Sequence, residues 1–427
     1  MDRSDQRLYP NAGERSSSRP NLSRRTLLAG SAAVGTAVAA GCLEGGTESG
    51  PDVEAPPEAV VERPTMYVFN TGDGTVSLID VETNTEVERR AIGLTASFPS
   101  NQFSPELTTA PEDPLWLNVD DGVRAVSAGP LEQQAAVETG SGANWQEQTP
   151  DGGHVVVSAR EPAHRQFRID ADRDSETFGE VTGEIDRRPE GGRGDNDGPG
   201  PCDVTIHPDG EYAYVPDLFG DTLTVVEIEA FEITAQIDVE RRNGVAPEPW
   251  MGTAAPDGDR MLVEHNDGTT GSESIWDVSD PAEPVELDRL TTDEGLGGGP
   301  LTSEIGPDSE TGYVFTPETN DVSVVDIEAG RVDRRIDLGG SAFVGSWDPD
   351  RTTLYVPVQT TGEVAVIDNE NRTIVDTIPV GPQPYGVTAA KVRIETGGES
   401  PSERIEHLTD EYETTYCIGD CACGHEL

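Results

Sequence analysis

The sequence predicts an all-β protein, a seven-bladed β-propeller of four-stranded antiparallel blades. Three observations predict it: a repeat of roughly 40 to 55 residues, short alternations of apolar and polar residues, and an absence of long helical patterns. Each repeat has a Pro-Asp turn, a Tyr/Leu-Val strand, a polar turn, a Val-x-Val-Ile-Asp strand and a further strand. One such unit cannot bury both of its faces, so we expect the units to pack in a ring.

The turn chemistry supports this interpretation, because proline presets φ, aspartate caps the turn and glycine accepts a positive φ. The clearest copies contain Pro208-Asp209-Gly210, Pro307-Asp308 and Pro349-Asp350. Seven blades are expected, and they begin near Met66, Pro105, Pro150, Pro208, Pro256, Pro307 and Pro349.

The run from Gly386 to Ala390 repeats a strand that normally precedes a Pro-Asp turn, yet no blade remains for it to open. We therefore expect it to pair with the first blade and to close the ring, which removes an exposed sheet edge.

The N-terminal residues 1–42 are predicted to be an export signal. Arg24 and Arg25 precede a short Ala/Gly-rich apolar run that is too short to span a membrane. The arginine pair resembles a twin-arginine signal, and the small residues before Cys42 resemble a lipobox. Cys42 would then be lipidated and hold the protein at the extracellular face of the cell membrane. The alternative is a plain cleavage site with an incidental cysteine.

The chain after Cys42 divides into three parts. Residues 43–64 are rich in Gly, Glu and Pro and are predicted to form a flexible acidic tether. The propeller is expected over 65–395, and an acidic tail over 396–427 carries a Cys/His cluster.

The chain is strongly acidic, with a formal net charge of −52, and Lys391 is its only lysine. This composition resembles that of proteins from extreme halophiles, in which salt screens the repulsion between like charges. It excludes nucleic acid as a partner, because no basic patch is available.

A family resemblance follows from the repeat itself. The segments Val380-Gly381-Pro382-Gln383-Pro384-Tyr385-Gly386-Val387 and Thr75-Val76-Ser77-Leu78-Ile79-Asp80 resemble the YVTN family of β-propeller repeats. The resemblance covers about residues 66–390. It implies the fold but little about function, because such propellers serve as surface proteins, binding modules and enzymes.

The tail offers a candidate metal site of three thiols and an imidazole within nine residues: Cys417, Cys421, Cys423 and His425. Thiolates with one histidine suit zinc or copper. Outside the cell a disulfide such as Cys417–Cys421 is the competing interpretation.

Inside the propeller the candidate cofactor-binding residues are weaker. His154 or His265 could face the axial channel, and Trp250 and Trp347 precede Pro-Asp turns and could line the channel mouth, although core packing is the favoured interpretation for both tryptophans. A weak calcium pattern is formed by alternating aspartates in one predicted loop, namely Asp170, Asp172 and Asp174.

Three functions remain open at this stage. The leading hypothesis is a lipid-anchored binding or scaffold module for a surface protein or small ligand, with no catalysis. The second is a metal-binding or redox protein that uses the C-terminal cluster beside the channel. The third is a lactonase-type hydrolase, which is the weakest because no clustered catalytic set is visible.

Overall fold

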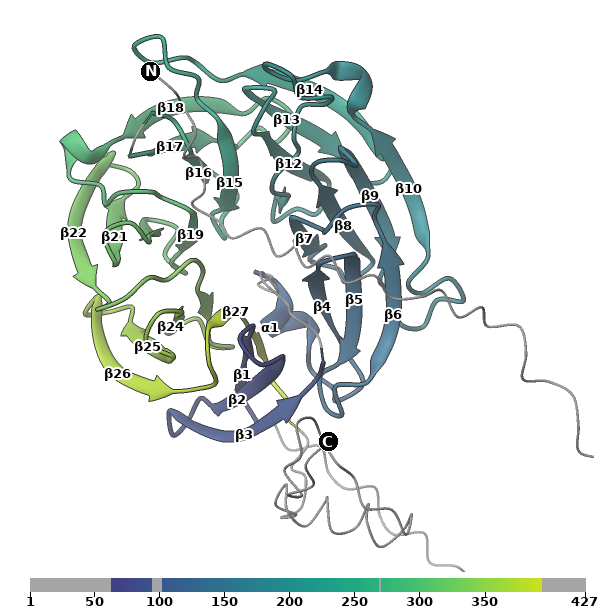
Figure 1. The fold of residues 1–427 in the computed structure, drawn as a ribbon, viewed down its shortest axis with the longest axis vertical. Coiled ribbons are helices and arrows are strands. Elements are labelled where there is room, and N and C mark those ends of the chain that lie inside the picture. Colours follow the sequence, from purple (N-terminus) through teal and green to yellow (C-terminus); the bar gives the residue numbers. More distant parts are fainter. Residues whose placement is uncertain (1–62, 94–101, 269, 394–427) are drawn as a thin grey trace, which may run out of the picture. The chain divides into compact units, whose positions relative to one another are not determined.

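The computed structural model describes residues 63–93, 102–268 and 270–393. These residues form a seven-bladed β-propeller, which confirms the predicted fold (Figure 1). Among the described residues, helix is limited to α1 (Ser104–Leu107) and two 3-10 turns, η1 (Arg188–Glu190) and η2 (Thr292–Glu294).

The strands follow one another blade by blade. Those of blades 1 to 3 are β27 (Pro384–Ala390), β1 (Thr65–Asn70), β2 (Thr75–Asp80) and β3 (Thr85–Ala91); β4 (Pro114–Val119), β5 (Gly122–Ser127) and β6 (Gln133–Glu138); β7 (Trp145–Gln148), β8 (His154–Ala159), β9 (Arg165–Asp170) and β10 (Val181–Asp186). Those of blades 4 and 5 are β11 (Thr205–Ile206), β12 (Tyr212–Asp217), β13 (Thr222–Glu227) and β14 (Glu232–Asp238); β15 (Pro249–Ala254), β16 (Arg260–His265), β17 (Ser272–Asp277) and β18 (Val285–Leu290). Those of blades 6 and 7 are β19 (Thr302–Ile305), β20 (Thr311–Thr316), β21 (Asp321–Asp326) and β22 (Arg331–Asp337); β23 (Ser346–Trp347), β24 (Thr353–Val358), β25 (Glu363–Asp368) and β26 (Thr373–Pro379).

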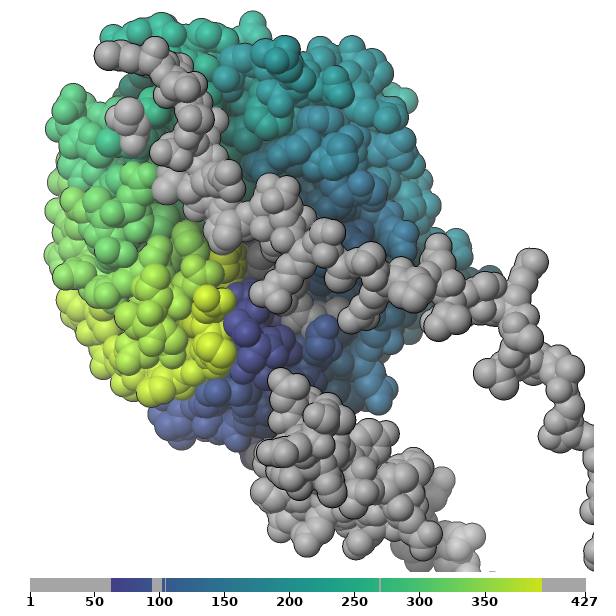
Figure 2. All heavy atoms as spheres, viewed as in Figure 1, coloured from purple at the N-terminus to yellow at the C-terminus, as the bar shows by residue number. Residues whose placement is uncertain are grey.

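The ring closes as the sequence predicts. The last strand, β27, pairs antiparallel with β1 and becomes the inner strand of blade 1, with Thr65 opposite Ala390 and Val68 opposite Val387. In Figure 2 the yellow end of the described chain meets its purple beginning at this seam.

Blade 2 departs from the four-stranded plan, since within the described residues its sheet holds three strands, β4 to β6. Helix α1 packs against β27, on the side where the inner strand of blade 2 would lie. Thr108, just after α1, accepts a hydrogen bond at 2.9 Å from the backbone nitrogen of Lys391, directly after β27.

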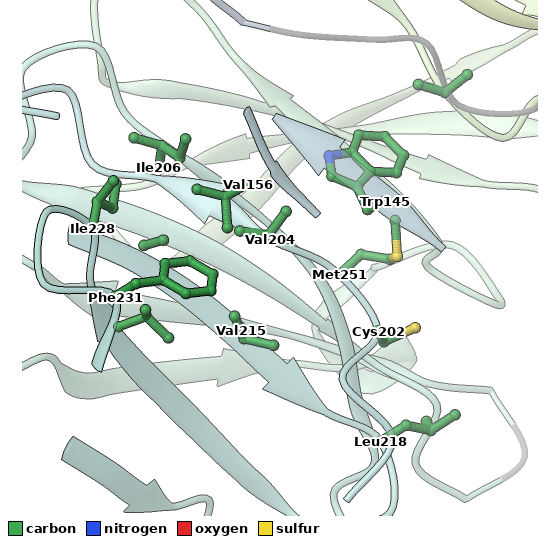
Figure 3. Packing of buried hydrophobic residues seen from close by; sticks show 13 residues of the cluster. Trp145, Val156, Cys202, Val204, Ile206, Val215, Leu218, Ile228, Phe231 and Met251 are labelled. Atoms are coloured by element: carbon green, nitrogen blue, oxygen red, sulfur yellow. The ribbon is translucent and has the colours of Figure 1, made fainter. Parts of the chain in front are cut away.

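The hydrophobic core lies between the blades. The central two strands of each blade are almost wholly buried, whereas outer strands such as β3 and β14 alternate between exposed and half-buried residues. Figure 3 shows one such cluster, which brings together side chains of blades 3, 4 and 5, among them Trp145, Val215 and Met251. Each blade is therefore held by its two neighbours.

A repeated polar position fixes the turn after the second strand of several blades. The last residue of that strand bonds to a hydroxyl two residues into the next strand, and the pairs are Asn70–Ser77, Asp217–Thr224 and His265–Ser274. These side chains are buried, so the bonds also satisfy polar groups that lack water.

Candidate functional site

The inner strands are linked around the axis by side chains that bond to the backbone of the next blade. Because side chains alternate between the two faces of a strand, one face of each inner strand meets the following blade. The threonine links, each of 2.7 Å, are Thr205 Oγ1 to Gly252 O, Thr253 Oγ1 to Ser303 O, and Thr302 Oγ1 to Phe343 O.

These inner strands surround a small cavity of about 20 Å³. A cavity of this size holds about one water molecule. Its lining residues come from blades 3 to 6 and from the segment before α1, and they are Gln102, Trp145, Glu147, Thr205, Gly252, Thr253 and Glu304.

Carboxylates gather around this cavity. Glu147 Oε2 accepts a hydrogen bond from the Ile206 nitrogen at 2.6 Å, and burial raises the pKa of Glu147 well above its usual range. Asp203 and Glu304 contribute further negative charge that raises the same pKa.

Asp203 is completely buried between blades 4 and 5. Its Oδ2 accepts a hydrogen bond from the Gly252 nitrogen at 2.7 Å, and its Oδ1 accepts one from the Val204 nitrogen at 2.7 Å. Burial outweighs these bonds and raises the pKa of Asp203 to about 7. A carboxyl group that titrates near neutrality can both take up and release a proton, as a general acid or base requires.

The segment around α1 closes the channel at the end that carries the Pro-Asp turns. Gln102 Nε2 donates to Ile206 O at 3.0 Å, and Arg351 Nη2 donates to Gln102 O at 2.5 Å. Arg351 Nε also lies 3.5 Å from Glu106 Oε1. Residues 102–107 thereby connect blade 4 to blade 7 across the axis.

Aromatic side chains gather at the opposite end, where the inner strands begin. The rings of Phe343 and Tyr385 stack with centroids 4.9 Å apart at 29°. Trp250 lies at the corresponding end of β15, and all three residues are half-buried. We call these three residues the aromatic mouth.

The other candidates from the sequence lie elsewhere. Trp347 is buried between blades 6 and 7, with its ring 5.5 Å from that of Tyr313, and it does not line the cavity. His265 is fully buried, and its side chain forms the hydrogen bond to Ser274 at the repeated turn position described above. His154 is half-buried at the start of β8.

The aspartates of the predicted calcium pattern accept hydrogen bonds from neighbouring residues of the same loop. Asp170 Oδ2 accepts hydrogen bonds from the hydroxyls of Ser175 and Thr177, and Asp172 Oδ1 accepts one from the Asp174 nitrogen. Within the described ranges, no group of three or more His, Cys, Asp or Glu side chains is arranged to hold a metal.

Several candidates lie outside the described residues: Arg24, Arg25, Cys42, Cys417, Cys421, Cys423 and His425. The export, lipidation and metal-binding predictions made for them stay predictions. The part of the chain that the structure describes holds no helix long and apolar enough to cross a membrane.

Comparison with known proteins supports the propeller fold but does not identify the protein. No protein-family model matches the chain, and no curated protein matches it. Among solved structures, a periplasmic gluconolactonase from Pseudomonas aeruginosa is similar at 16% identity and a TM-score of 0.60, covering 77% of this chain and 99% of that one. A Lactobacillus plantarum protein matches at 14% identity and a TM-score of 0.61, with the same coverage of both chains.

A third structure, from Bacteroides uniformis, is described as a candidate 6-phosphogluconolactonase. It is 14% identical, with a TM-score of 0.60, and the match covers 77% of this chain and all of that one. At these identities the comparisons establish a seven-bladed propeller with structural neighbours of the lactonase type.

Proposed function

We propose that this protein is an exported, lipid-anchored propeller that binds a small polyhydroxylated molecule at the aromatic mouth of its channel. The observation that supports the proposal is the set of three half-buried aromatic residues at one end of the inner strands, together with Glu147 and Glu304 in the cavity that these strands surround. Sugar-like ligands suit this pairing, because their C–H faces pack on aromatic rings and their hydroxyls bond to carboxyl groups.

The charge around the cavity argues against a phosphorylated ligand. No lysine or arginine is among the residues that line the cavity, whereas Glu147 and Glu304 are. A phosphate group placed there would meet like charge and would find no guanidinium or ammonium partner. The ligand class is therefore neutral.

Hydrolysis of a lactone is a second candidate function, favoured by the position of Glu147, which lines the cavity and whose pKa is raised by burial. Its ionised carboxylate would take a proton from a water molecule whose oxygen attacks the lactone carbonyl carbon. The ring C–O bond would then break, and the released oxygen would take the proton back from Glu147 to give a hydroxy acid.

Binding is tested by isothermal titration calorimetry of the full chain with glucitol, choline and glucose 6-phosphate. We expect heat from glucitol alone and at least a tenfold loss of affinity in Trp250→Ala. Glu370→Gln, a charge change in an exposed turn, is the matched control and should bind as the unaltered chain does. Binding of choline alone would overturn the proposal in favour of a cationic ligand. Absence of binding by all three compounds would also overturn it.

The hydrolytic candidate is tested separately with glucono-1,5-lactone in a pH-stat. Catalysis predicts a rate above spontaneous hydrolysis that disappears in Glu147→Gln but persists in Glu370→Gln. A rate equal to the spontaneous one, together with measurable glucitol binding, would leave a binding protein without this activity.

A further inference from the structure

One pair of side chains breaks the repeat in blade 5. The fifth residue of the second strand faces the second residue of the third strand, and in four blades this cross-strand pair is apolar. The apolar pairs are Phe69–Val76, Pro216–Leu223, Phe315–Val322 and Pro357–Val364. In blade 5 the same position holds Glu264 opposite Glu273.

Both glutamates are fully buried and face blade 6. Leu262 and Ile275 occupy the neighbouring pair on the same face, and they pack with Ile305 of blade 6. Neither glutamate exposes any surface, and none of their four carboxyl oxygens has a hydrogen-bond partner. Burying such groups without partners is costly, so something is expected to compensate them.

A serine of the next blade points at the same place. Ser303 on β19 corresponds in the repeat to Gly345 of blade 7, two residues before the end of the inner strand. A Cβ atom added at Gly345 would lie 2.6 Å from Phe315, the blade 6 counterpart of Glu264. The side chain of Ser303 therefore faces Glu264, and its hydroxyl lowers the pKa of that carboxyl.

The Ser303 hydroxyl is itself buried and is left without a hydrogen bond of acceptable geometry. Five oxygen atoms from three side chains thus remain unsatisfied at one point between blades 5 and 6. They come from β16, β17 and β19, so the fold brings them together from two blades.

Two other buried acids of this propeller have an arginine partner. Arg187 Nη2 lies 2.9 Å from Asp217 Oδ2, and Arg335 pairs with Asp321. No described arginine or lysine forms an ion pair with Glu264 or Glu273. The positive charge must then come from solution, either as a metal ion or as a proton.

We propose that Glu264, Glu273 and Ser303 bind a divalent cation of the calcium type between blades 5 and 6. Two carboxylates neutralise a divalent charge, and hard oxygen donors are what calcium prefers. Four carboxylate oxygens and one hydroxyl approach the coordination number of six to eight that calcium takes, and water or backbone oxygens supply the remainder. The ion would join the two blades at a position where four other blades have an apolar pair.

The test is thermal unfolding and elemental analysis of the full chain in molar potassium chloride, with calcium chloride or with a calcium chelator. We expect close to one calcium per chain and a melting temperature several degrees higher with calcium. Both should disappear in Glu264→Gln/Glu273→Gln and persist in Glu370→Gln. Thiols bind calcium poorly, so the C-terminal cysteines do not confuse the measurement.

A second double variant separates loss of calcium binding from misfolding. Glu264→Phe/Glu273→Val installs the pair of blade 6, and it should fold with a melting temperature that does not respond to calcium. Absence of calcium, together with stability that falls as the pH rises, would overturn the proposal in favour of a proton shared by the two carboxyls. A calcium response that survives both double variants would overturn it by placing the ion elsewhere.

Discussion

Replacing His265 by asparagine should remove a loss of stability that the unaltered protein suffers in mild acid. The imidazole is fully buried, with Nδ1 3.1 Å from Pro247 O and Nε2 2.7 Å from Ser274 Oγ. Because a carbonyl oxygen can only accept, Nδ1 carries the proton and the ring is neutral. Burial, followed by the charge of Arg289, holds the pKa of His265 well below its ordinary value.

The magnitude follows from proton linkage. The unfolded chain takes up a proton near the ordinary histidine pKa of about 6.5, whereas the folded protein does not. Stability is therefore fully present above that pH and is lost as the pH falls. Between about pH 6.5 and 5.5 the loss is about 1 kcal/mol, and each further unit removes up to about 1.4 kcal/mol until the folded pKa is reached.

The assay is urea unfolding at fixed potassium chloride over this pH range, for the unaltered chain and for His265→Asn. Asparagine occupies the matching position in blade 1, where Asn70 Nδ2 donates to Ser77 Oγ at 2.9 Å, so the variant should fold. All other titrating groups cancel in the difference between the two proteins. The reasoning fails if the difference stays constant with pH, or if the variant folds normally but no longer binds glucitol.

Three further outcomes follow from the structure. Trp347→Ala should cost about 3–5 kcal/mol of unfolding free energy, because a buried ring is lost between two blades, and should leave glucitol affinity unchanged in calorimetry. Arg187→Met should cost about 3–5 kcal/mol in urea unfolding by leaving Asp217 buried and unpaired, and adding Asp217→Leu should recover much of it. Cys421→Ser/Cys423→Ser should remove about one zinc or copper per chain in elemental analysis, whereas a metal content that does not change would favour the disulfide.

Much of the fold could be predicted from the sequence because its causes are local. A Pro-Asp turn and an alternating strand depend on residues that are consecutive in the sequence, and seven copies of the repeat predict seven blades. The pairing of β27 with β1 was predicted from a repeat unit left over at the end. The three-stranded blade 2 was not predicted, because a weaker copy of the repeat near Pro105 was expected to open a four-stranded blade, whereas Pro105 lies in α1.

The channel residues could not be found in the same way. Glu147 and Glu304 look ordinary in a chain with 81 acidic residues, and only the ring places them around one cavity. The sequence does carry one signal: Glu264 and Glu273 occupy a position that is an apolar pair in four other blades. Aligning the blades position by position would have exposed them.

The seam between β1 and β27 also constrains how the chain can fold. Thr65 and Ala390 are neighbours in the sheet, yet nearly the whole propeller separates them along the chain. During synthesis the inner edge of β1 stays unpaired until β27 has been made, and such long-range pairing is slow. A chain truncated after β26 would keep that edge open and would tend to pair with a second molecule. The speed of seam formation, rather than the strength of any blade, is then expected to govern how much protein escapes aggregation.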